Sequence, residues 1–220
     1  MTYNPNLSKK LDSSYYSRSR TWPSKFTITN NSNILDIGCA NGDLGHFLKS
    51  KYNCTVTGID IVEENVKRAR EILDSCHHLD IENCRLDLLN GPFDYIIFSD
   101  SIEHLLNPDV VLHKIKALMT PSSKVLFSIP NIRNYRVILP LILLDSFDYQ
   151  EEGLLDRTHL RFFTISSFHS LLASCGYCIE QSYVDLPLNS KAGLLNIASF
   201  GIFKRILTSH YFIQSCLVHS

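Results

Sequence analysis

The chain has 220 residues, enough for one domain with a continuous hydrophobic core. Hydrophobic residues make up 45% of the sequence and charged residues 20%, which is ordinary for a soluble globular protein. The 21 Lys and Arg residues nearly cancel the 22 Asp and Glu residues. This balance argues against a broad electrostatic grip on nucleic acid, so we do not expect nucleic acid as a partner.

The seven cysteines are scattered and odd in number, which predicts reduced thiols in a cytoplasmic protein. Cys175 and Cys178 form a CxxC pair, but the sequence has no second pair to complete a structural zinc site. The longest apolar stretches are 137–144 and 192–203. Both are shorter than the ~18–20 residues of a membrane-spanning helix, so we expect no transmembrane segment.

Short apolar runs with β-type residues alternate with helical patterns from residue 33 onward. The hydrophobic spacing predicts strands at 33–37, 54–59, 76–79, 93–98, 124–129 and 177–184, and helices at 43–52, 63–74, 107–119 and 164–174. This alternation predicts an α/β fold with a mostly parallel sheet and helices on both faces. The segment 131–160 breaks the alternation, and we interpret it as an insertion after the fifth strand.

A glycine-rich turn follows the first predicted strand. That strand contains Asp36 and leads into Gly38-Cys39-Ala40-Asn41-Gly42, where the next helix opens. In such turns glycines let the backbone approach a nucleotide, and the helix N–H groups face it. The second strand ends at Asp60, whose carboxylate can accept both hydroxyls of a ribose. The pattern therefore predicts a nucleotide-type cofactor at this end of the sheet.

The rival class is a nicotinamide-dependent dehydrogenase. Its turn is normally Gly-x-Gly-x-x-Gly, whereas here the third small residue comes one position earlier. No dehydrogenase-like catalytic set follows downstream.

Asp36, Gly38, Ala40 and Gly42 resemble the first motif of the class I S-adenosylmethionine methyltransferases, with Ala40 in place of the middle glycine. The resemblance implies a Rossmann-like, seven-stranded, mostly parallel sheet and S-adenosyl-L-methionine as cofactor. It also implies that Asp36 lies near the methionine amino group and that residues 38–42 line the cofactor. In the same way, Asp60 and Ile61 are expected to hold the ribose and the adenine edge.

The same resemblance implies an acidic residue after the third strand, bonded to the adenine amino group and followed by an apolar neighbour. Asp80-Ile81 and Asp87-Leu88 both fit that description. In family members, the number of residues between this acidic residue and the Phe-Asp that opens strand four is usually larger than the number between Asp87 and that Phe-Asp. We therefore choose Asp80 and Ile81.

The fourth strand ends in Ser99-Asp100-Ser-Ile-Glu103-His104. In the resembling family this strand end faces cofactor and substrate, which makes Ser99 a cofactor contact and Asp100 and His104 catalytic candidates. His104 could accept a proton from the methyl acceptor. If the stretch is helical, Asp100, Glu103 and His104 share one face.

A divalent metal is the alternative for this cluster. His159, in the motif from Leu155 to Thr164, is expected near the same edge, so Asp100, Glu103, His104 and His159 form a candidate ligand set and His159 a third catalytic candidate. The arrangement resembles metal-assisted methyltransferases of small RNA 3′ ends and of quinone precursors. The simpler alternative is that Glu103 caps a helix or pairs with an arginine, and that His159 packs.

Three further motifs, at residues 100–105, 128–131 and 155–164, resemble those of a bacterial methyltransferase-domain subgroup associated with surface polysaccharides. A group linked to methionine biosynthesis and the ubiquinone-type methyltransferases are similar to this subgroup. This implies O-methylation of a hydroxyl on a small-molecule or glycan acceptor. A protein of another class, which binds the cofactor without turnover, is the further alternative.

The chain divides into residues 1–32, expected to cover the cofactor site, a methyltransferase domain at 33–185, and an amphipathic segment at 186–220. Within the domain, residues 131–160 are the substrate-side insertion. Tyr15, Tyr16 and Arg18 are candidates to close over the cofactor. The amphipathic segment could pack on the sheet, mediate a homodimer or associate weakly with a membrane surface, so monomer and homodimer both stay open.

Overall fold

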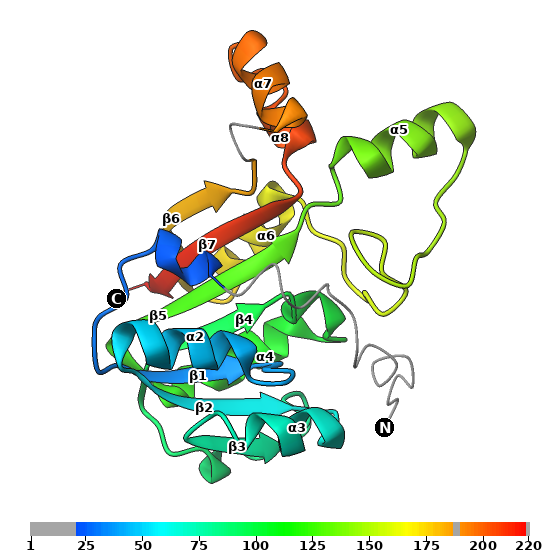
Figure 1. Cartoon of the computed structure of the whole chain (residues 1–220). Coiled ribbons are helices and arrows are strands. Elements are labelled where there is room, and N and C mark those ends of the chain that lie inside the picture. Colours follow the sequence, from blue (N-terminus) through cyan, green and yellow to red (C-terminus); the bar gives the residue numbers. More distant parts are fainter. Residues whose placement is uncertain (1–20, 187–189, 219–220) are drawn as a thin grey trace.

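The computed structural model describes residues 21–186 and 190–218, and its central element is one seven-stranded sheet (Figure 1). The strand order is β3-β2-β1-β4-β5-β7-β6. All neighbouring strands are parallel except β7, which runs antiparallel to β5 and β6. The strands are β1 (Asn33–Ile37), β2 (Thr55–Asp60), β3 (Ser75–His78), β4 (Phe93–Ser99), β5 (Met119–Pro130), β6 (Tyr177–Val184) and β7 (His210–Leu217).

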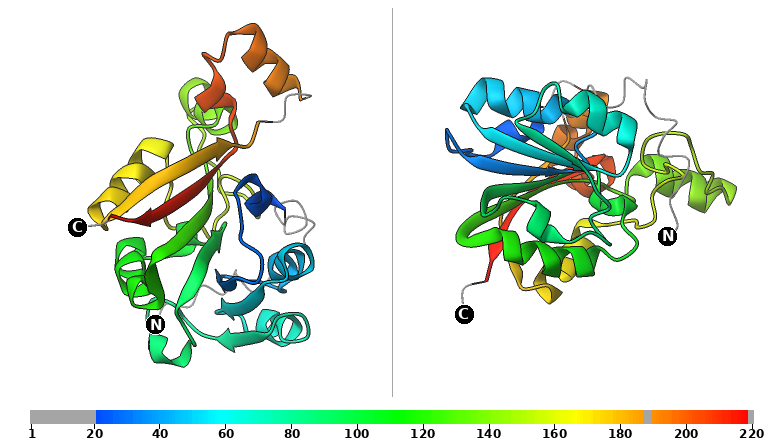
Figure 2. Two further views of the ribbon diagram at one scale, coloured as in Figure 1. Left: turned by 90° about the vertical axis from the view of Figure 1, so that its left-hand side faces the viewer. Right: turned by 90° about the horizontal axis from the view of Figure 1, so that it is seen from below.

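Helices cover both faces of this sheet, as the alternation predicts (Figure 2). The α-helices are α2 (Asp43–Tyr52), α3 (Glu63–Ala69), α4 (Pro108–Ile115), α5 (Tyr135–Leu144), α6 (Ile165–Ser174), α7 (Lys191–Ala198) and α8 (Lys204–Leu207). Short 3-10 turns are η2 (Trp22–Lys25), η3 (Leu86–Leu88), η4 (Ile102–His104) and η5 (Lys116–Leu118). The Rossmann-like, mostly parallel fold with seven strands is thereby confirmed.

The sheet is buried on both faces, so its side chains pack into two hydrophobic cores, one on each face. In β5 the side chains alternate: Val125 and Phe127 pack with α4 and α6, whereas Leu126 packs with α2 and α3. This two-sided burial explains why the strands read as continuous apolar runs rather than as an alternating pattern. It also sets the register, because a shift by one residue would exchange the two faces.

The segment predicted at 186–220 contributes the seventh strand, so the sheet does not end at residue 185. β7 lies between β5 and β6, with Phe127 opposite Ile213. We interpreted residues 186–220 from their sequence as one amphipathic segment and therefore did not predict this strand. The neighbours that bury β7 are β5 and β6, which come earlier in the chain. The rest of the segment forms α7 and α8, which stand away from the sheet (Figure 1).

Three predicted elements differ from the structure at their ends. The predicted helix 63–74 stops at Ala69, because the chain turns there toward β3. The helix 107–119 divides into α4 and η5, and β5 begins at Met119 rather than at 124. The helix after residue 164 begins as expected, since Thr164 and Ser167 form a reciprocal capping box.

Two buried asparagines connect the start of the insertion to the chain before β7. Asn131 Nδ2 donates to the carbonyl oxygens of Arg205 at 2.9 Å and Thr208 at 2.8 Å. Asn134 caps α5 through Arg136 N–H and donates through Nδ2 to Thr208 O at 2.8 Å. We name this pair the asparagine clamp. It holds the base of α5 against the end of α8.

Asn131→Ala removes the side-chain donor to Arg205 O and one of the two donors to the buried Thr208 O, so we expect it to lower the free energy of unfolding by about 1–3 kcal/mol. Urea unfolding followed by circular dichroism measures this change. Asn90→Ala is the matched control at an exposed position and should change stability by less than about 0.5 kcal/mol. Equal stability of the two variants would contradict the structural role of the clamp.

Candidate active site

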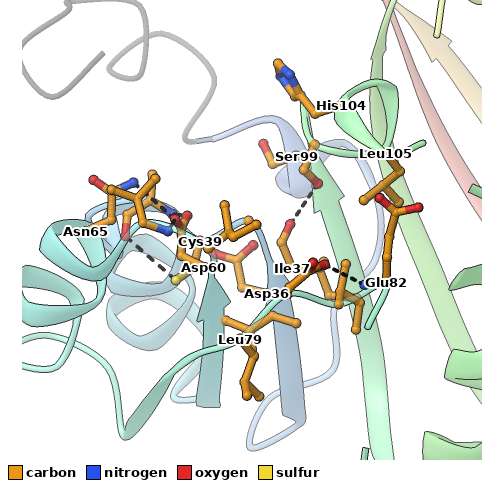
Figure 3. Close-up of a pocket in the computed structure, with 18 of the residues that line it drawn as sticks. Asp36, Ile37, Cys39, Asp60, Asn65, Leu79, Glu82, Ser99, His104 and Leu105 are labelled. Atoms are coloured by element: carbon orange, nitrogen blue, oxygen red, sulfur yellow. Dashed lines mark hydrogen bonds between the residues drawn. The ribbon is translucent and has the colours of Figure 1, made fainter. Parts of the chain in front are cut away.

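A pocket of about 1040 Å³ opens at the carboxyl ends of β1, β2 and β4 (Figure 3). Ligands of open α/β sheets bind at this edge, where the strand order reverses. The pocket is lined by these predicted site residues: Asp36, Gly38, Cys39, Ala40, Asp60, Ile61, Asp80, Ile81, Ser99, Asp100 and His104. Asn41 and Gly42 belong to the turn but do not line the pocket, and Glu103 and His159 lie outside its lining.

The glycine-rich turn needs small residues for two separate reasons. Gly38 has φ +77°, and a Cβ there would lie 2.8 Å from Cβ of Ser101. Gly42 has φ +84° and ends the turn as the N-cap of α2. Ala40 has φ +46°, so the alanine at the middle position adopts a conformation that glycine adopts at less cost.

Asp36 is the most unusual group in the pocket. Its carboxylate is fully buried, and neither oxygen has a hydrogen-bond partner among the described residues. Burial, with a smaller contribution from the nearby charge of Asp60, raises the pKa of Asp36 to about 7. Such a carboxylate is suited to a positively charged ligand group, which would supply the missing partner.

Asp60 is held in place by the turn it faces. Its Oδ2 accepts a hydrogen bond from Ala40 N–H at 2.9 Å, and its Oδ1 accepts from Val62 N–H at 2.8 Å. Burial raises the pKa of Asp60, while these two N–H donors and the side chain of Asn65 oppose the shift. Oδ1 also accepts from Asn65 Nδ2 at 3.3 Å, so Oδ2 is the oxygen that keeps a second lone pair for a ligand hydroxyl.

The structure separates the two acidic candidates after β3. Asp80 and the buried Ile81 line the pocket, whereas Asp87 lies in η3, outside the lining, and pairs with Arg85 at 2.8 Å. Neighbouring Glu82 accepts hydrogen bonds from the backbone N–H groups of Leu106 and Asn107. Glu82 thus joins the loop after β3 to the loop before α4.

The part of the N-terminal segment that the structure describes reaches the pocket wall. Trp22 Nε1 donates to Ser99 Oγ at 3.0 Å, and its buried ring stacks on Phe212 of β7. Tyr15, Tyr16 and Arg18 lie outside the described residues. Trp22 has no motif of its own, and the only sequence signal was its position shortly before the first strand.

Asp100 does not share a helical face with Glu103 and His104, because the stretch is not helical at Asp100. This residue has φ +49°, and η4 begins only at Ile102. Its Oδ1 accepts from Ser128 Oγ at 2.8 Å and lies 3.6 Å from Nε2 of His210, at the start of β7. Sequence reasoning did not identify His210, since β7 itself was not predicted.

His104 lies at the pocket wall, apart from Asp36 and Asp60 in Figure 3. Its Nδ1 is 3.0 Å from the carbonyl oxygen of Thr158. Because a carbonyl oxygen only accepts, this contact places the proton of a neutral imidazole on Nδ1 and leaves Nε2 as the basic nitrogen. The loop that carries Thr158 therefore sets which nitrogen of His104 can accept a proton.

Glu103 and His159 lie next to His104. One ligand atom each from Glu103, His104 and His159 can be chosen so that all lie within 4.8 Å of one another. Both Glu103 and His159 are buried, with Nε2 of His159 3.8 Å from Oε1 of Glu103 and its Nδ1 3.3 Å from Leu154 O. Asp100 is not a member of this group, and the arginines considered as partners have contacts elsewhere: Arg157 with Glu151, and Arg161 with Leu106 O.

The loop from 155 to 163 is fastened to this turn. The backbone N–H groups of Leu160 and Arg161 both donate to Glu103 O at 2.9 Å. Asp156 Oδ1 accepts from N–H and Oγ1 of Thr158, which shapes the bend. The long motif at 155–164 is thus the segment that carries His159 and orients His104.

Comparison with known proteins agrees with this geometry. The profile of a family described as a methyltransferase domain matches residues 15–182. The ubiquinone biosynthesis O-methyltransferase of Hydrogenovibrio crunogenus is 27% identical over 168 residues, which cover 71% of this chain and 66% of that protein. The cyclopropane-fatty-acyl-phospholipid synthase of Escherichia coli K12 is 32% identical over 97 residues, 43% of this chain and only 25% of that protein.

Among solved structures, a SAM-dependent methyltransferase from Archaeoglobus fulgidus superposes with a TM-score of 0.65 at 18% identity, covering 96% of this chain and 97% of that one. The sheet order and this superposition define the Rossmann-like fold of class I methyltransferases. The chain belongs to the methyltransferase-domain family, and it spans only part of the length of these curated relatives. No helix in the described ranges combines the length and the apolar character that crossing a membrane requires.

The raised pKa of Asp36 predicts how the ligand-free protein responds to pH. Unfolding lets the carboxyl ionise near pH 3.8, whereas the folded group ionises only near 7. Stability is therefore lost as the pH rises through this window and stays low above it. We expect Asp36→Asn to be more stable than the wild type at pH 8, with an advantage that shrinks by about 2–3 kcal/mol at pH 5.

Denaturant unfolding at pH 5, 6, 7 and 8 measures this difference. Asp109→Asn, an exposed carboxylate on α4, is the matched control and should show a difference that does not change with pH. If the difference in stability between Asp36→Asn and the wild type also stayed the same at every pH, the raised pKa of Asp36 would be contradicted.

Proposed function

We propose that this methyltransferase methylates a hydroxyl oxygen of a sugar or other small molecule. The observation that carries this proposal is the orientation of His104 at the pocket wall, with Nε2 as its basic nitrogen. A hydroxyl is a weak nucleophile until its proton is removed, and histidine is the side chain that most often acts as the general base. A hydroxyl acceptor thus gives His104 a role that a neutral amine acceptor would not need.

The residues of the pocket suit the cofactor. The carboxylate of Asp36, which has no hydrogen-bond partner among the described residues, fits the methionine ammonium. Residues 38–40 allow the close backbone approach, and Asp60 with Ile61 receives the ribose. Asp80, Ile81 and Ser99 also line the pocket, which supports our proposal that Asp80 and Ile81 bind the adenine and that Ser99 contacts the cofactor. When bound, S-adenosylmethionine supplies an electrophilic methyl group on a sulfonium. The protein contributes mainly by holding donor and acceptor in line.

The lining around His104 combines polar and apolar side chains, and its polar members support a hydroxylated small molecule or glycan as acceptor. Asp100, Asn107 and Thr158 join His104 in the lining. The likeness to a ubiquinone biosynthesis O-methyltransferase also supports oxygen as the methylated atom. We also propose, from the resemblance to the bacterial subgroup, that the acceptor belongs to the synthesis of a surface polysaccharide.

A labelled-methyl screen against nucleotide sugars, lipid-linked sugars, quinone precursors and small RNA tests the acceptor. With the acceptor found, we expect His104→Gln to lower kcat by about 10²–10⁴-fold. Glutamine keeps a donor toward Thr158 O, so KM and the Kd for S-adenosylmethionine should change little.

His113→Gln, at an exposed position on α4, is the matched control and should retain full activity. An unchanged kcat for His104→Gln would remove His104 as the base. Cofactor binding without transfer to any acceptor would instead favour the non-catalytic binding protein.

Metal-assisted O-methylation, as in the quinone-precursor or RNA 3′-end type, is the second candidate. The grouping of Glu103, His104 and His159 favours it, since two imidazoles and a carboxylate are a common donor set for divalent transition metals. A metal held there would lower the pKa of the acceptor hydroxyl. Asp100 is not part of this metal-binding group, because its carboxylate is directed to Ser128 and His210. We propose it as a catalytic contact instead.

Calorimetric titration with Mn²⁺, Co²⁺ and Mg²⁺ distinguishes the two candidates. If a metal is used, the wild type binds Mn²⁺ or Co²⁺, and His159→Ala weakens binding by about tenfold or more. Glu103→Gln provides a second variant that preserves side-chain volume in case His159→Ala does not fold. Negligible binding by the wild type would leave His104 to act alone.

A further inference from the structure

The helix α5 exposes an unusual amount of apolar surface. Its sequence contains no acidic residue, and Val137 is its only buried residue. Ile142, Leu143 and Leu144 are each more than 70% exposed, and Leu139 and Leu141 more than 40%. Soluble proteins rarely leave so many neighbouring aliphatic side chains in water, so this helix requires a partner.

A second projection carries side chains of the same kind. α7 and the turn before α8 expose Leu194, Leu195, Ile197, Phe200, Ile202 and Phe203. Phe200 is 97% exposed and Ile202 77% exposed, and both are large apolar groups. We name the exposed side chains of α5 and of residues 194–203 together the apolar surface.

The two projections are joined at their base and leave the sheet on the same side (Figures 1 and 2). The asparagine clamp connects the start of α5 to Thr208, directly after α8. α5 follows the carboxyl end of β5, and α8 precedes the antiparallel β7, so both arise at the edge of the sheet where the pocket opens.

Basic side chains accompany this apolar surface. Arg133 and Arg136 lie at the start of α5, Lys191 begins α7, and Lys204 and Arg205 form the first turn of α8. Residues 190–218 contain no Asp or Glu. The acidic groups nearest in sequence are Asp185, which accepts from Ser209 Oγ at the base of the projections, and those that follow α5 from Asp145 onward.

We propose that the apolar surface docks on an anionic lipid bilayer. Exposed aliphatic and aromatic groups insert into the headgroup region, while the flanking Lys and Arg meet the negative lipid phosphates. A second copy of the chain is a poorer occupant, because a symmetric contact would bring the same basic groups together. This inference does not depend on the methyl acceptor. It implies that the open edge of the sheet lies close to the membrane.

Flotation of the full-length protein with vesicles tests the proposal. Vesicles of phosphatidylcholine mixed with phosphatidylglycerol are compared with vesicles of pure phosphatidylcholine, at low and high salt. We expect the wild type to float with the mixed vesicles and to be released by salt. Ile142→Glu combined with Leu143→Glu should lower the bound fraction about tenfold, and Phe200→Glu combined with Ile202→Glu should act similarly.

Leu88→Glu is the matched control, since Leu88 is 56% exposed on η3, which precedes β4 and lies far from the apolar surface in sequence. It should bind as the wild type does. Circular dichroism and S-adenosylmethionine titration establish that all variants are folded. Failure of the wild type to float, or equal flotation of the Glu variants, would overturn the proposal. A dimer seen by sedimentation and dissociated by the same substitutions would also overturn it, in favour of a contact between copies.

Discussion

The parallel register of β1, β2 and β4 is the constraint on which the rest of the structure depends. Ile37 lies opposite both Ile59 and Phe98, so the three strands end level with one another. The glycine-rich turn, Asp60 and the segment from Ser99 to His104 all begin where these strands end. Hydrophobic cores on both faces hold the register, because a slip of one residue would bury the wrong side chains on each face.

The pocket combines several groups that are unfavourable for folding. Asp36 is buried without a partner among the described residues, and Ala40 and Asp100 have positive φ angles. Such features persist only where the surrounding structure is strong enough to impose them. Here the stability comes from the sheet and its two cores, and the unfavourable groups are directed at the space where ligands bind.

The strand β7 connects the sheet to both the pocket and the projecting helices. Its first residue, His210, lies 3.6 Å from Asp100, and its Phe212 stacks on Trp22. Just before β7, Thr208 accepts hydrogen bonds from Asn131 and Asn134. The proposed lipid-facing surface and the proposed acceptor side therefore share one structural support, which is inserted between β5 and β6.

The sequence by itself determined the order of strands and helices up to residue 184 except for α5, which lies in the segment interpreted as an insertion, together with the glycine-rich turn and the acidic residues that follow the strands. These features depend on local periodicity and on backbone freedom. Only the tertiary structure decided that residues 210–217 are a strand, that Trp22 reaches Ser99, and that Asp100 turns away from Glu103. His159 was expected near the edge that carries Glu103 and His104, and only the tertiary structure separated these three residues from Asp100. These contacts join segments far apart in the chain, so the packing of the sheet creates them, and no spacing in the sequence encodes them.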